Sequence, residues 1–192
     1  MTTMQTHVVR RIGIAANAAE LEAALMRLRS TEGRVPQALW LHSYAVCEPD
    51  GRFGLACVFQ AADAATLQRH ADRCGLPAHE VLPVAHTLVE QAFAPTRVYL
   101  VRRRHAWPRG TDLGRQGAVA RRVADAVIGR EVSWLHSHVV READGRLGTV
   151  CLYQGIDPAA LARHAARAGL PADEIVPVLG RVVVRDASRN AA

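Results

Sequence analysis

Apolar and polar residues alternate along this chain in two periods, one typical of helices and one typical of strands. Asn17 and Glu20 form a capping-box pattern, and Leu21, Leu25 and Leu28 then recur at helical spacing. Apolar runs with the period of a strand lie on both sides of this segment. The pattern therefore predicts a strand, a capped helix and further strands.

Turn and cap residues predict the elements that follow. Asp50-Gly51 and Asp144-Gly145 each separate two apolar runs, which indicates a tight β-hairpin with positive φ at both turn residues. A second helix is expected over Asp63–Gly75 and again over Asp157–Gly169, since each segment begins with a capping residue and ends at glycine. A last strand, "VLPVAHTLV" or "IVPVLGRVVV", follows each helix.

The chain contains the same segment twice. Trp40 to Val84 aligns with Trp134 to Val178 without a gap, at a constant offset of 94, and 26 of the 45 positions are identical. This pattern indicates a tandem duplication. We expect one repeat over residues 1–94, a second over residues 95–186 and a flexible tail over residues 187–192.

Each repeat reads as βαββαβ, the ferredoxin-like order, so the predicted fold class is α+β. The tight turn predicts that Tyr44 lies opposite Cys57 and that His42 lies opposite Phe59. One face of the sheet would then collect Trp40, His42, Tyr44, Leu55, Cys57 and Phe59. The other face would carry the small aliphatic residues expected beneath helices: Leu39, Leu41, Ala45, Ala56 and Val58.

Both predicted faces are too apolar to be exposed to water. We therefore expect the two sheets to pack face to face with the helices outward, as in a dimeric α+β barrel whose halves are fused into an intrachain pseudo-dimer. A cavity between the sheets would be lined by Trp40, Tyr44, Cys57, Phe59, Trp134, Cys151 and Tyr153. Whether the fused unit forms a further homo-oligomer stays open.

Composition narrows the functional classes. The chain of 192 residues is 49% hydrophobic and 22% charged, without a signal peptide or an apolar run long enough to span a membrane, so a cytoplasmic globular protein is expected. The net charge of +6 comes with arginine as the only strongly basic residue and with no nucleic-acid-binding motif, which disfavours a nucleic-acid partner. The four cysteines lack zinc-ribbon spacing, and free thiols are expected.

Histidines carry the candidate chemistry. His136 and His138 are two residues apart on a predicted strand, so their side chains share a face about 6.6 Å apart along the chain, within reach of one metal ion. Imidazole suits nickel, zinc, copper and iron. His42 occupies the position equivalent to His136, and Tyr44 replaces the second histidine. The alternative is that these amphipathic residues fill a core, each hydrogen-bonded to a neighbour.

His70 and His164 form a second group of candidates. Each lies on the apolar stripe of its predicted helix, as does Leu67 three residues before His70. Both are candidate additional metal ligands, and both are also consistent with ordinary core histidines.

The segments "WLHSYAV…DGR…ACVFQ" and "WLHSHVV…DGR…TVCLYQ", each followed by a helix containing "RHA" and by "GLPA", resemble a small bacterial ferredoxin-like domain family of unknown function that includes nickel-binding proteins. The resemblance implies sheet-to-sheet pairing and metal binding. Gln60, Gln154, Arg10 and Arg102 stand where that family usually has glutamate.

Three functional hypotheses follow. The first is a protein that binds nickel or another divalent transition metal through His136, His138 and His42, with His70 and His164 as further candidates. The second is a barrel enzyme or small-molecule-binding protein that uses a cavity histidine as general base. The third is a structural module. No pattern indicates an organic cofactor or names a reaction, so enzymatic activity stays open.

Overall fold

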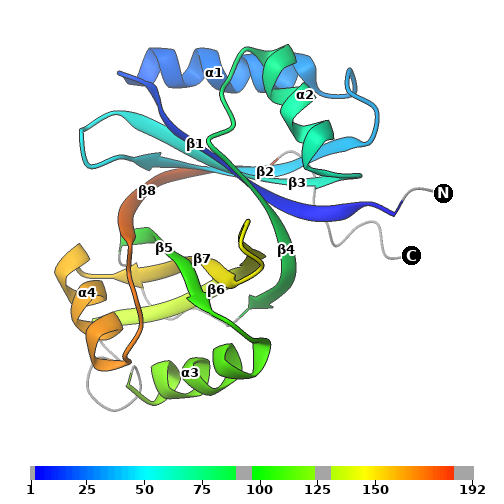
Figure 1. Cartoon of the computed structure of the whole chain (residues 1–192). Helices are drawn as coiled ribbons and strands as arrows, with labels where there is room; N and C mark the ends of the chain where they lie inside the picture. Colours follow the sequence, from blue (N-terminus) through cyan, green and yellow to red (C-terminus); the bar gives the residue numbers. More distant parts are fainter. Residues whose placement is uncertain (1–2, 90–96, 124–130, 184–192) are drawn as a thin grey trace. The chain divides into compact units, whose positions relative to one another are not determined.

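A computed structural model describes residues 3–89, 97–123 and 131–183, which form two successive βαββαβ repeats (Figure 1). The first repeat consists of β1 (Gln5–Ala15), α1 (Ala18–Thr31), β2 (Ala38–Cys47), β3 (Phe53–Ala61), α2 (Ala64–Cys74) and β4 (Glu80–Val89). The second consists of β5 (Arg97–Trp107), α3 (Gly110–Val123), β6 (Val132–Arg141), β7 (Leu147–Gly155), α4 (Pro158–Arg167) and β8 (Glu174–Val183). The predicted α+β class and ferredoxin-like repeats are confirmed.

The strands are hydrogen-bonded in the order β1-β3-β2-β8-β5-β7-β6-β4, and β4 also pairs with β1. The first compact unit is formed by Met1–Val84 and Leu179–Ala192, and the second by Ala85–Val178. The second half of β8 therefore completes the sheet of the first unit beside β2, and the second half of β4 completes the other sheet beside β6. The expected boundary at residues 94/95 and the expected tail lie outside the described residues.

The helix starts follow the predicted caps. Asn17 Oδ1 accepts a hydrogen bond from the Glu20 amide at 2.9 Å, and the side chains of Asp63 and Asp157 cap α2 and α4 in the same way. In each repeat the two helices cover one face of the sheet (Figure 1). Within the described ranges, no helix is long and apolar enough to cross a membrane.

The β2–β3 hairpin differs from the predicted tight turn. The Gly51 amide donates to the Glu48 carbonyl at 2.9 Å, and only Gly51 of the loop residues has positive φ, at 81°. The loop is thus a turn centred on Pro49 and Asp50 with a left-handed glycine after it, a three-residue connection. The loop between β6 and β7 repeats these bonds, with φ 81° at its glycine.

One extra loop residue shifts the register by one. Tyr44 pairs with Ala56, and Ser43 pairs with Cys57, so the predicted pairing of Tyr44 with Cys57 is wrong. A bulge between Trp40 and His42 then shifts the register again, and Trp40 pairs with Phe59. The second repeat has the same bulge between its tryptophan and its first strand histidine.

These two irregularities change the predicted faces. Trp40, Cys57 and Phe59 pack with residues of α1 and α2 in the core beneath the helices. In the second unit, Trp134, Cys151 and Tyr153 pack with residues of α3 and α4 in the same way. The prediction that these six residues line a cavity on the face away from the helices is therefore wrong. His42, Tyr44, His136 and His138 lie on the sheet face opposite the helices.

Candidate metal site

His136 and His138 lie next to each other in the second unit, on the sheet face opposite the helices. Beyond the bulge, β6 is regular, so residues two apart point the same way. The two imidazole rings have centroids 5.2 Å apart and an interplanar angle of 75°. His138 is buried, with 6% of its surface exposed, and His136 is partly exposed.

A hydroxyl on the neighbouring strand orients His138. Thr87, in the part of β4 that belongs to the second unit, places its Oγ1 3.1 Å from His138 Nδ1. In the tautomer whose Nδ1–H donates to this hydroxyl, the lone pair that can bind a metal ion is on Nε2. Metal-binding histidines usually have their second ring nitrogen fixed by a hydrogen bond of this kind.

The first unit has the same arrangement with different chemistry. The rings of His42 and Tyr44 have centroids 5.3 Å apart and an interplanar angle of 77°. The guanidinium of Arg181, from the end of β8 in this unit, lies 5.7 Å from the centre of the Tyr44 ring. Burial raises the pKa of the Tyr44 phenol, and the charge of Arg181 opposes this shift. The protonated phenol is a poor metal ligand.

His70 and His164 are on the other side of the sheets. Each is 2% exposed and packs beneath its helix, against Phe59 or Tyr153 at centroid distances of 5.1 and 5.8 Å. Burial is the main cause that lowers the pKa of each imidazole to about 4, and a neighbouring arginine, Arg11 or Arg103, adds to it. The sheet therefore separates these neutral histidines from His42, His136 and His138, which lie on the face opposite the helices.

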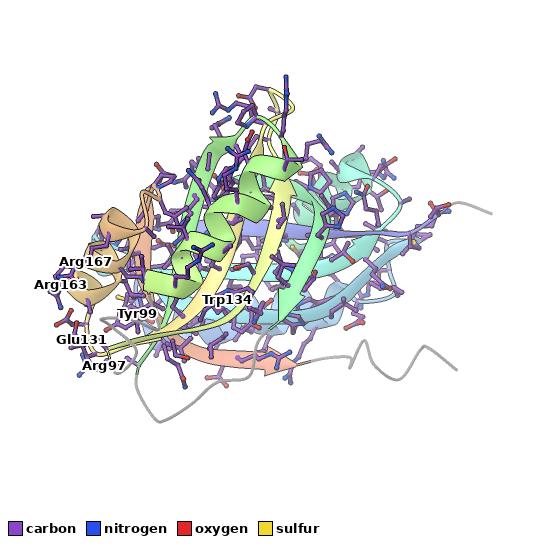
Figure 2. The ribbon with its side chains drawn as sticks, turned by 90° about the horizontal axis from the view of Figure 1, so that it is seen from below. Arg97, Tyr99, Glu131, Trp134, Arg163 and Arg167 are labelled. Atoms are coloured by element: carbon purple, nitrogen blue, oxygen red, sulfur yellow. The ribbon has the colours of Figure 1, made fainter. Side chains whose placement is uncertain are left out.

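The structure also shows a buried polar chain that the sequence reasoning missed. In the second unit, Trp134 Nε1 donates to Ser137 Oγ at 2.8 Å, and Ser137 Oγ donates to Cys151 Sγ at 2.7 Å. Arg103 donates to the same sulfur at 3.1 Å and to Tyr153 Oη at 3.4 Å. Figure 2 labels Trp134 in this unit.

The first unit has the same hydrogen bonds except the last, because Phe59 stands at the position of Tyr153. Trp40 Nε1 donates to Ser43 Oγ at 2.9 Å, and Ser43 and Arg11 both hydrogen-bond the Cys57 thiol. Burial raises the pKa of that thiol, and Arg11 opposes the shift. A sequence signal was available, because the Trp-x-x-Ser spacing and the arginine pair of the first strand occur in both copies. These cysteines are structural parts of the core beneath the helices.

Two further arginines form buried ion pairs on the sheet faces opposite the helices. Arg10 lies 3.4 Å from Glu48, and Arg102 lies 2.9 Å from Glu142. Both guanidinium groups are fully buried. Arg10 and Arg102 are thus each paired with a carboxylate from the following hairpin.

The candidate site in the second unit offers two protein ligands. Among the described residues, no group of three or more histidine, cysteine or acidic side chains is arranged to hold a metal ion. An ion held by His136 and His138 would therefore complete its coordination with water or with a ligand from solution.

Comparison with known proteins gives one family. The model described as "Nickel responsive protein SCO4226-like" matches residues 8–84 and 99–178, one match in each repeat. No curated protein sequence matches the chain.

Solved structures with similar folds have low sequence identity. A provisionally named monooxygenase from Fusobacterium nucleatum is 9% identical, with 97% of this chain and 100% of that chain covered and a TM-score of 0.49. A chlorite dismutase mutant from Candidatus Nitrospira defluvii is 10% identical, with 92% and 91% covered and a TM-score of 0.48. A heme-binding protein from Thermus thermophilus is 11% identical, with 94% and 90% covered and a TM-score of 0.44.

Proposed function

We propose, from the premise that this chain belongs to the nickel-responsive SCO4226-like family, that it binds a divalent transition metal ion of the nickel type through His136 and His138. The observation that carries the proposal is the pair of adjacent imidazoles, one of them oriented by Thr87. Imidazole nitrogen is a preferred ligand of nickel, copper and zinc.

The ring geometry fits a shared ion. With metal–nitrogen distances of about 2.0–2.1 Å, two imidazoles bound to one ion at an angle between about 90° and 110° have centroids roughly 4.5–5.2 Å apart. The observed distance of 5.2 Å lies at the upper end of this range, so the two rings are close enough to share one ion. The remaining positions would exchange water for small ligands, which suits a protein that senses or carries an ion.

Nickel uptake by protein without a histidine tag tests the proposal. We expect equilibrium dialysis to give about one ion per chain, and His136→Ala or His138→Ala to weaken binding at least about tenfold. His105→Asn is the matched control, because it removes a half-exposed histidine that pairs with Asp144 instead. Asparagine also tolerates the positive φ of 47° at that position.

A thermal readout gives an independent check. A ligand at about 100 times its Kd stabilises a protein by about 2.7 kcal/mol, so saturating nickel should raise the Tm of the wild type and leave that of His138→Ala unchanged. The proposal fails if the wild-type protein takes up no nickel, zinc or copper and its Tm does not respond to these ions.

A further inference from the structure

We propose that only the second unit binds metal, and that the residue pair 44/181 prevents binding in the first. The inference rests on the proposed function. The offset of 94 makes Tyr44 equivalent to His138, and Arg181 equivalent to Thr87. The two halves of the duplication therefore differ at two positions that contact each other in both units.

The backbone frame of the two sites is the same. The ring pairs have centroid distances of 5.3 and 5.2 Å and interplanar angles of 77° and 75°. The bulge that places these residues on the face opposite the helices is present in β2 and in β6. The difference between the sites is therefore one of side-chain chemistry, and His42 already supplies one imidazole in the first unit.

Each of the two differences opposes metal binding in the first unit. Tyr44 replaces the second imidazole with a phenol beside His42. Arg181 places a permanent positive charge 5.7 Å from the Tyr44 ring, where Thr87 offers a neutral hydroxyl in the second unit. A guanidinium has no lone pair to offer a metal ion and repels a divalent cation.

The two positions should act together. Tyr44→His alone restores the second imidazole but leaves the charge of Arg181 beside it. Arg181→Thr alone removes the charge but leaves one imidazole. Only the double variant reproduces the arrangement of the second unit. Thr87 and Arg181 both lie outside the residues that the family model matches. The residues proposed to allow or prevent metal binding are therefore at the ends of β4 and β8, beyond the matched part of each repeat.

The test counts nickel ions per chain by equilibrium dialysis on untagged protein. We expect one ion for the wild type and for each single variant, and two for Tyr44→His with Arg181→Thr. The matched control combines Tyr44→His with Arg115→Thr, which removes the charge of an exposed arginine on α3, and should stay at one ion. A double variant that binds one ion while the wild type binds one, or a wild type that binds two, overturns the inference.

The converse variant addresses the same question in the second unit. Thr87→Arg should lower the affinity of the wild-type site at least tenfold, whereas Thr87→Ser, which keeps the hydroxyl, should retain it. A Thr87→Arg protein that binds nickel as tightly as the wild type contradicts the inference even if the variants of the first unit do not fold.

Failure of the proposed function has a different signature. A wild type without any bound metal refutes binding at His136 and His138. In that case, uptake of one ion by Tyr44→His with Arg181→Thr would still support the role of residues 44 and 181, and no uptake by the double variant would refute both ideas.

Discussion

The buried guanidinium of Arg102 is paired with Glu142, which lies 2.9 Å away with only 5% of its side chain exposed. Gly148 makes this close approach feasible, since a Cβ at that position would contact Glu142 Oε1 and lie 2.5 Å from the Arg103 carbonyl oxygen. Gly54 has the same role beside Glu48 in the first unit. These glycines and glutamates are therefore fixed by packing.

Removing one partner of the buried Arg102–Glu142 ion pair should lower the free energy of unfolding. Glu142→Gln leaves the buried guanidinium of Arg102 without its counter-charge, and we expect a loss of about 3–5 kcal/mol in the free energy of unfolding. Glu131→Gln is the matched control, because Glu131 pairs with Arg163 on α4 (Figure 2). Both of these side chains are nearly half exposed. That change should cost about 1 kcal/mol or less. Urea denaturation measures both, and equal losses would contradict a structural role for the buried pair.

At the scale of single residues, the sequence identified the histidine pair but not its surroundings. His136 and His138 were recognisable because two residues of one strand share a face. Thr87 was not, because it comes from a strand end more than forty residues away, and no local pattern indicates which strand that end joins. The buried carboxylate beside Arg102 was hidden for the same reason.

Elements were predictable where a local residue determines them. The capping residues Asn17, Asp63 and Asp157 begin their helices as expected. The hairpin was predicted with the wrong register, because Asp-Gly fits both a two-residue and a three-residue loop. The residue before it does not distinguish the two, since Pro49 and Ala143 precede the same three-residue loop. The bulge at Trp40 could not be predicted, because no glycine or proline marks its position. A one-residue shift in register moves every later side chain to the other face of the sheet.

Helices α2 and α4 each bury a neutral histidine, which predicts a pH-dependent stability. The pKa of His70 and His164 is lowered from 6.5 to about 4 in the folded protein, so between these values the unfolded chain binds protons that the folded chain does not. Stability should therefore fall as the pH drops from about 6.5 to about 4. Each histidine contributes on the order of 3 kcal/mol to this loss.

Urea denaturation in the presence of a chelator, between pH 7.5 and 4.5, measures this dependence without a contribution from metal binding. His70→Gln with His164→Gln should flatten the curve, because an amide does not titrate. His86→Gln changes an exposed histidine on β4 and should leave the slope as it is. An unchanged slope in the double variant would show that other groups cause the loss.

At the scale of the whole molecule, the two repeats exchange strand ends. The second half of β4 leaves the first repeat to pair with β6, and the second half of β8 leaves the second repeat to pair with β2. The sequence established the duplication through 26 identical positions but not this exchange, since strand pairing between distant segments depends on packing that a single sequence does not display.

This exchange predicts the behaviour of an isolated repeat. A fragment of residues 1–94 carries the end of β4 but lacks the end of β8 that pairs with β2. Its own β4 end is the equivalent strand, so two fragments can exchange these ends and satisfy both sheets. We expect a dimer by analytical ultracentrifugation at micromolar concentration. A folded, stable monomer would contradict this expectation.

The covalent link between the repeats has an evolutionary consequence. In an assembly of two identical chains, any mutation appears in both subunits, so a two-fold axis forces every site to be present twice or not at all. Joining the copies in one chain removes that symmetry and lets each half vary separately. Tyr44 and Arg181 can then coexist with His138 and Thr87, and one half can be selected for stability while the other is selected for ligand affinity.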